Sequence, residues 1–223
     1  MSVLIYADHQ TASTVAATLF TASVIENPYE TLGLTYDSVL DETFSRLCSM
    51  HKDGLYSLKN ARMYQLCEFV PGNNDSPSVC DLLTETLFHE AMPDPDKYVI
   101  PYAEGRNWAQ ICNDFENDIF EHGGIDLMLL VLRPDGSLLY NPAGEELAPV
   151  THVELIGGEK VVSAGMATIM RAKKLLVFAT GKESAKAVQQ ALGGPVSNTL
   201  PASYLQLHQN VTFILDEEAA SLL

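Results

Sequence analysis

Basic residues are scarce in this sequence. Its 223 residues include 13 lysines and arginines against 29 aspartates and glutamates, which gives a net charge of −16. A surface of that sign repels nucleic acid and anionic membranes, so we expect neither as a partner of the main activity. The net charge does not bear on a local anion pocket.

Clustered cysteines and long apolar runs are also missing. The four cysteines, Cys48, Cys67, Cys80 and Cys112, are too widely spaced for a zinc finger, and we expect reduced thiols, no metal site and no cofactor. No apolar run approaches the roughly 20 residues of a membrane span. The N-terminal segment MSVLIYADHQ lacks the basic region and apolar core of a secretory signal, so we expect a soluble, cytoplasmic protein.

What is present suits a folded domain of the α/β class. Hydrophobic residues make up 47% of the chain, and a length of 223 residues fits one domain, which we predict over residues 1–223. Apolar runs predict strands at residues 3–6, 31–35, 62–69, 99–102, 125–132, 174–180 and 211–215. Helical periodicity predicts helices at residues 11–25, 39–52, 78–90, 107–122, 164–171, 184–192 and 201–207. Strands that alternate with helices predict a Rossmann-like, three-layer α/β/α fold with a mostly parallel sheet.

The strand expected at residues 125–132 ends abruptly at Arg133-Pro134-Asp135-Gly136. This pattern indicates a tight turn with a carboxylate at its tip. In open α/β sheets, ligands bind at such strand ends, so Asp135 is a candidate catalytic residue. Pro-Asp-Gly is also a common turn sequence, and a purely structural role for Asp135 stays open.

Three blocks of the sequence resemble a known family. Residues 32–54, residues 56–69 and the stretch from residue 161 to the end are similar to glucosamine-6-phosphate deaminases and 6-phosphogluconolactonases. The resemblance covers nearly the whole chain. It implies a fold of the type shared with ribose-5-phosphate isomerase, and a role in amino-sugar metabolism with a small sugar or sugar derivative as ligand.

The positions that carry the chemistry in that family are altered here. The resemblance places the sugar-phosphate loop at Asp37-Ser38-Val39-Leu40, where the family's two glycines and proline are absent and Asp37 adds a negative charge. It places the general base at Cys67, the ring-opening histidine at Ser137 and the glutamate that orients this histidine at Pro142. Asp135 is the one catalytic position that is retained.

Several other residues remain candidates for a rebuilt site. Glu68 would line a pocket or stand as a solvated carboxylate, and Cys67 would act as a nucleophile or weak base or pack as a small core residue. The candidates for ligand binding are Thr35, Ser38, Arg133 and Lys182.

We therefore weigh three hypotheses. In the first, the chain is a catalytically degenerate member of the deaminase family. In the second, it is an active sugar-phosphate isomerase or lactonase-type hydrolase with a rebuilt site. In the third, it is a non-catalytic interaction or ligand-sensing module, with self-association into a homo-oligomer as one form of it.

Overall fold

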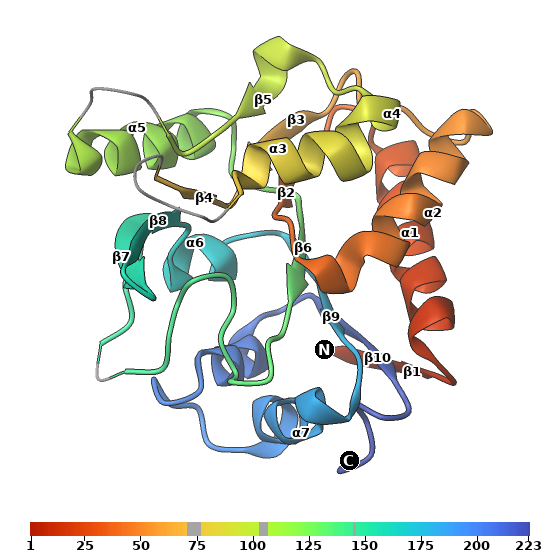
Figure 1. Ribbon diagram of the computed structural model, residues 1–223, viewed down its shortest axis with the longest axis vertical. Helices are drawn as coiled ribbons and strands as arrows, with labels where there is room; N and C mark the ends of the chain where they lie inside the picture. The colour runs from red at the N-terminus through yellow and green to blue at the C-terminus, as the bar shows by residue number, and fades with distance from the viewer. Residues whose placement is uncertain (71–76, 103–106, 145) are drawn as a thin grey trace.

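A seven-stranded sheet forms the centre of the molecule in the computed structural model, which describes residues 1–70, 77–102, 107–144 and 146–223 (Figure 1). The strands run in the order β1-β10-β9-β6-β2-β3-β5, and every neighbouring pair is parallel. Their bounds are β1 (Ser2–Tyr6), β2 (Thr31–Leu34), β3 (Arg62–Gln65), β5 (Tyr98–Val99), β6 (Leu127–Val131), β9 (Lys174–Ala179) and β10 (Val211–Asp216).

Helices cover both faces of this sheet, so the predicted three-layer α/β/α architecture is confirmed (Figure 1). One face packs against α1 (His9–Glu26), α2 (Asp41–Lys52), α3 (Val79–Leu83), the π-helical segment η2 (Thr84–Phe88) and α4 (His89–Ala91). The other face packs against α5 (Trp108–Glu121), α6 (Met166–Met170), α7 (Ala185–Gly193) and the 3-10 segment η5 (Pro201–Leu207). In the described part of the chain, no helix combines the length and the apolar character that crossing a bilayer requires.

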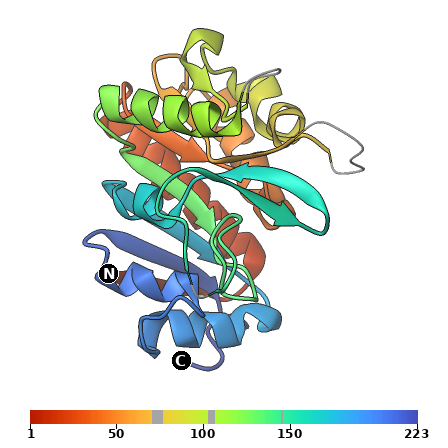
Figure 2. The same ribbon diagram turned by 90° about the vertical axis from the view of Figure 1, so that its left-hand side faces the viewer.

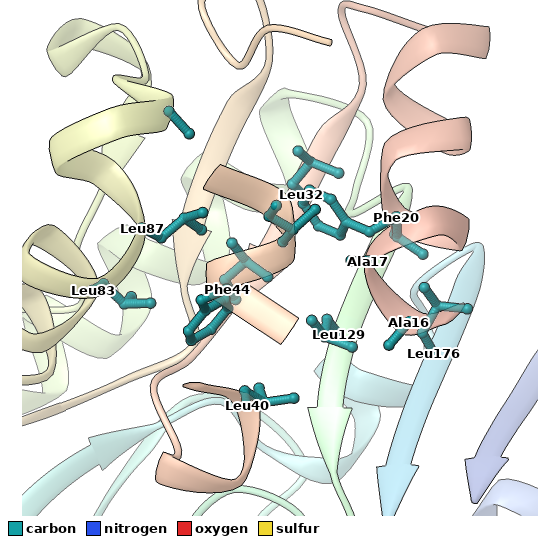
Figure 3. Packing of buried hydrophobic residues seen from close by; sticks show 14 of the residues in the cluster. Ala16, Ala17, Phe20, Leu32, Leu40, Phe44, Leu83, Leu87, Leu129 and Leu176 are labelled. Atoms are coloured by element: carbon teal, nitrogen blue, oxygen red, sulfur yellow. The ribbon is translucent and has the colours of Figure 1, made fainter. Parts of the chain in front are cut away.

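The strands supply side chains alternately to the two layers, as the two-residue period of a β-strand requires. Along β6, Leu129 joins the cluster under α1 and α2, whereas Leu130 joins the cluster under α5 and α7. Figure 3 shows part of the first cluster, with Phe20 on α1, Phe44 on α2 and Leu129 on β6. Both layers are therefore anchored on the same central strand.

Polar side chains cap the long helices α1 and α5, which begin at His9 and Trp108 where the sequence predicted residues 11 and 107. The Asp8 carboxylate accepts a hydrogen bond from the Thr11 backbone N–H at 2.7 Å at the start of α1. The Asn107 side chain accepts from the Ala109 N–H at 2.8 Å at the start of α5. Each acceptor satisfies a backbone N–H that has no partner inside the helix.

A second, antiparallel sheet of three strands was not predicted. It has the order β4-β8-β7, with β4 (Cys67–Phe69), β7 (His152–Ile156) and β8 (Glu159–Ser163), and Figure 2 shows β7 and β8 as a separate ribbon beside the main sheet. The single strand expected at residues 62–69 is thus two strands, because the chain leaves the main sheet at Leu66. The Leu66 N–H still donates to the Leu34 carbonyl, and its carbonyl accepts from the Ala164 N–H, both at 2.8 Å.

Candidate functional site

Two of the predicted site residues meet where β2 and β3 end. Thr35 Oγ1 and Cys67 Sγ lie 2.8 Å apart, and both side chains are buried. Burial raises the pKa of the Cys67 thiol to about 12. The sulfur is therefore protonated at neutral pH and lacks the thiolate that a nucleophile or base requires.

Arg133 places a positive charge at the same strand ends and forms an ion pair with Asp37. Arg133 Nε lies 3.5 Å from Asp37 Oδ2, and its Cζ lies 4.5 Å from the centre of the Tyr140 ring. The guanidinium also donates to the Leu139 carbonyl at 3.2 Å. The negative charge that the sequence places in the phosphate loop is thus paired, and an anionic ligand would compete with Asp37 for this cation.

The Asp135 turn has the geometry that its sequence indicates. Asp135 Oδ1 accepts hydrogen bonds from the backbone N–H of Ser137 at 2.9 Å and from its hydroxyl at 2.7 Å. Gly136 adopts a positive φ of 82° in the turn, a conformation that costs glycine little. Asp135 is exposed and Ser137 is buried, so this carboxylate orders the turn. A catalytic role for either residue stays a prediction.

Glu68 is enclosed by hydrogen-bond donors, and the alternative of a solvated carboxylate is wrong, since only 3% of the residue is exposed. Its two oxygens accept five hydrogen bonds of 2.8 to 3.1 Å. The donors are the Gln65 amide, the Ser78 hydroxyl and the backbone N–H groups of Phe69, Val79 and Cys80. A carboxylate has about four lone-pair positions, so Glu68 has no acceptor position left for a substrate proton.

The last two candidate ligand residues lie apart from this group. Ser38 and Lys182 are exposed, at the starts of the 3-10 segments η1 (Ser38–Leu40) and η4 (Lys182–Ser184). Among the described residues, neither side chain has a hydrogen bond or ion pair with Thr35, Cys67 or Arg133. Five surface pockets of about 250 to 710 Å³ lie elsewhere, and none of them is lined by Thr35, Cys67 or Arg133.

The sequence analysis missed one polar pair at the same edge of the sheet. His9 Nδ1 lies 2.8 Å from Thr180 Oγ1. His9 is the first residue of α1, three residues after the end of β1, and Thr180 directly follows β9. His9 shows no ligand spacing with the other histidines, so there was little reason to select it from the sequence. In the described parts of the chain, no group of three or more His, Cys, Asp and Glu side chains is arranged to hold a metal ion.

Known proteins share both the sequence pattern and the fold of this chain. The model of the family described as glucosamine-6-phosphate isomerases/6-phosphogluconolactonase matches residues 9–214. The chain belongs to this family. The resemblance drawn from three sequence blocks is confirmed.

Individual members of the glucosamine-6-phosphate isomerase/6-phosphogluconolactonase family match over their full length. A glucosamine-6-phosphate deaminase from Halothermothrix orenii is 32% identical, with all of both chains covered. One from Rhodopirellula baltica is 31% identical, covering 100% of this chain and 96% of the relative. The solved structure of a monomeric glucosamine-6-phosphate deaminase is 26% identical and covers both chains completely with a TM-score of 0.93. The 6-phosphogluconolactonase of Trypanosoma brucei shares the fold at a TM-score of 0.79 and 22% identity.

Proposed function

We propose that this family member has lost the deaminase reaction and keeps the scaffold as a non-catalytic protein of amino-sugar metabolism. The observation that carries the proposal is the internal ion pair between Arg133 and Asp37. Arg133, which lies near the Thr35 and Cys67 side chains, is thereby paired with a negative charge of the chain itself.

The loss of a base at Cys67 supports this proposal. The resemblance implies that the family removes the C2 proton of its substrate with a carboxylate at this position. With a pKa of about 12, the Cys67 thiol carries a thiolate fraction of about one in 10⁵ at pH 7. General-base catalysis requires a group whose pKa lies near the working pH. The neighbouring Glu68 cannot replace it, because both of its oxygens are already engaged.

The anion site supports the proposal as well. A sugar phosphate is held in the family by a glycine-rich loop, whereas here the loop begins with Asp37, whose Oδ1 accepts from the Val39 N–H at 3.1 Å. One carboxylate oxygen of Asp37 thus lies against the backbone of the loop and the other faces Arg133. Like charges a few ångströms apart cost roughly 1–4 kcal/mol, so a phosphate is disfavoured beside this residue.

The decisive experiment measures ammonia release from glucosamine-6-phosphate by the purified protein, with the Halothermothrix orenii relative as a positive control. We expect no release above the blank when the protein is present at concentrations comparable to the substrate. Circular dichroism of the same sample shows that it is folded. Turnover at an ordinary enzyme rate, on the order of 1 per second or faster, contradicts the proposal.

A further inference from the structure

The largest of the five surface pockets lies beside β5, the edge strand of the main sheet, and neither Asp37 nor Arg133 lines it. It has a volume of about 710 Å³, within the range of small-molecule sites. Lys59, which precedes β3, lines it together with Tyr98 and Ile100, the first residue of β5 and the residue after its end, so the pocket flanks this edge strand. Thr35 and Arg133 follow β2 and β6, which lie further inside the sheet, and neither residue lines the pocket.

Two aromatic rings form a fixed, apolar wall of this pocket. The rings of Phe88 and Tyr98 meet edge to face, with their centroids 5.0 Å apart. The Tyr98 hydroxyl donates to the side-chain oxygen of Gln65, which holds the ring in place from behind. The two rings are nearly perpendicular, at 76°, so they form a rigid apolar corner against which the ring of a ligand can make further aromatic contacts.

The helical segment beside the pocket has an unusual form. Thr84 and Phe88 line the pocket from the two ends of η2, a π-helical turn between α3 and α4. π-Helical turns are rare in proteins, and many of those that occur lie at functional sites. Beyond them, Met92 is 69% exposed, which leaves a large apolar side chain in water at the pocket rim. Methionine is flexible and polarisable, so it adapts to a ligand that covers it.

The charges at the rim indicate the sign of the ligand. Among the described residues, Lys52, Lys97 and Lys173 form ion pairs with carboxylates, whereas Lys59 shares with Lys160, Lys174, Lys182 and Lys186 the lack of such a partner; of these five, Lys59 is the one that lines the pocket. Lys59 is exposed and has no ion-pair partner in the part of the chain that the structure describes. Asp94 also lines the pocket, but its charge is offset by Lys97 at 3.7 Å.

From this combination we propose that the pocket binds a small amphipathic anion: a flat, apolar body with one carboxylate. The apolar body lies against Phe88, Tyr98 and Met92, and the carboxylate reaches Lys59. Binding of such a ligand would cover the exposed apolar surface of the pocket and would also give Lys59 an ion-pair partner. The proposal concerns a site apart from Cys67 and Arg133, and it holds whether or not the deaminase reaction is retained.

The test uses 2-naphthoate as the probe and its neutral amide as a comparison, with binding measured by calorimetry on the full chain. We expect 2-naphthoate to bind in the micromolar to millimolar range. Thr84→Trp, at an exposed pocket position that tolerates a larger side chain, should weaken it at least tenfold. Lys59→Gln should weaken the binding of 2-naphthoate several-fold and leave the binding of the amide unchanged. Lys186→Gln, an equal change of charge on α7, is the control and should leave the binding of both compounds unchanged.

Chemical labelling gives a second measurement, independent of calorimetry. Cys80 also lines the pocket and is partly exposed, whereas Cys48, Cys67 and Cys112 are buried. Bound 2-naphthoate should slow the alkylation of Cys80 by iodoacetamide, as read by peptide mapping. Absence of binding at millimolar probe, or binding and alkylation that are the same with Thr84→Trp, overturns the proposal.

Discussion

At the scale of single residues, Glu30 carries the clearest conflict between burial and charge. Only 3% of the residue is exposed, its Oε2 accepts from the Ser23 hydroxyl at 3.0 Å, and its Oε1 has no hydrogen-bond partner among the residues that the structure describes. Burial raises the pKa of this carboxyl from 4.5 to about 7. The folded protein therefore keeps a proton there over a pH range in which the unfolded chain releases it.

This shift predicts a pH dependence of stability with a definite sign. Between about pH 4.5 and 7 the folded state binds more protons at Glu30 than the unfolded chain does. The contribution of Glu30 to the free energy of unfolding therefore falls as the pH rises and is fully lost above pH 7. The full shift corresponds to on the order of 3 kcal/mol. Glu30→Gln should remove this dependence and gain stability relative to the wild type between pH 5 and pH 8, measured by urea unfolding. Glu85→Gln, at an exposed position, is the control, and parallel pH profiles for wild type and Glu30→Gln contradict the expectation.

At the scale of elements, Glu68 joins the strand β4 to the start of the helix α3. Its carboxylate lies on β4 and accepts the Val79 and Cys80 N–H groups at the start of α3. These amides have no carbonyl partner inside the helix, so Glu68 stabilises the helix end, and a negative charge at this end also suits the helix dipole. The site candidate that lies beside Cys67 thus acts as a helix cap.

Replacing Glu68 tests this structural role. Glu68→Gln keeps the size of the side chain but turns an amide NH2 toward groups that donate, and it should cost about 2–4 kcal/mol of unfolding free energy. Amide hydrogen exchange should show the loss of protection concentrated at Val79 and Cys80. Glu85→Gln in the next turns of the same helical stretch should change little. A Glu68→Gln protein as stable as the wild type argues against the cap.

The elements that could be predicted from the sequence are those with local signals. The helices at residues 9–26 and 108–121 follow from apolar periodicity and from Asp8 and Asn107, the side chains that cap them. The hairpin β7–β8 also had a local signal, since Gly157-Gly158, both at positive φ, joins two strands of alternating pattern. The departure of β4 from the main sheet had no local sequence signal, because it depends on pairing with Ser163, almost a hundred residues later in the chain.

The residues of the candidate site could also be predicted from the sequence, but their contacts with one another could not. The sequence identified these residues in different ways. Thr35 ends the strand predicted at residues 31–35, Arg133 follows the one predicted at residues 125–132, and the resemblance places the general base of the family at Cys67. The contact of Thr35 with Cys67 and the pairing of Arg133 with Asp37 depend on the order of strands in the sheet. That order places β6 beside β2, and no local pattern encodes it.

At the scale of the whole molecule, two apolar clusters lie on opposite faces of one sheet. Strand β6 is buried throughout and contributes Leu129 to one cluster and Leu130 to the other. The single tryptophan, Trp108, lies on α5, which covers only the second face. If residues 1–223 are one cooperative domain, as the sequence predicts, a substitution that destabilises the first cluster must also shift the unfolding transition that Trp108 reports.

Leu129→Ala and Leu130→Ala test this cooperativity as a matched pair, because both side chains are fully buried and adjacent on β6. Each substitution removes buried methyl groups and should cost about 2–5 kcal/mol. We expect urea unfolding followed by Trp108 fluorescence and by far-ultraviolet circular dichroism to give coincident transitions in both variants. Leu129→Ala should shift the fluorescence transition as far as the circular dichroism transition, although its cavity faces the other layer. A fluorescence transition that Leu129→Ala leaves in place would mean that the two layers unfold separately, since Trp108 would then report on an α5 layer that is stable without its counterpart.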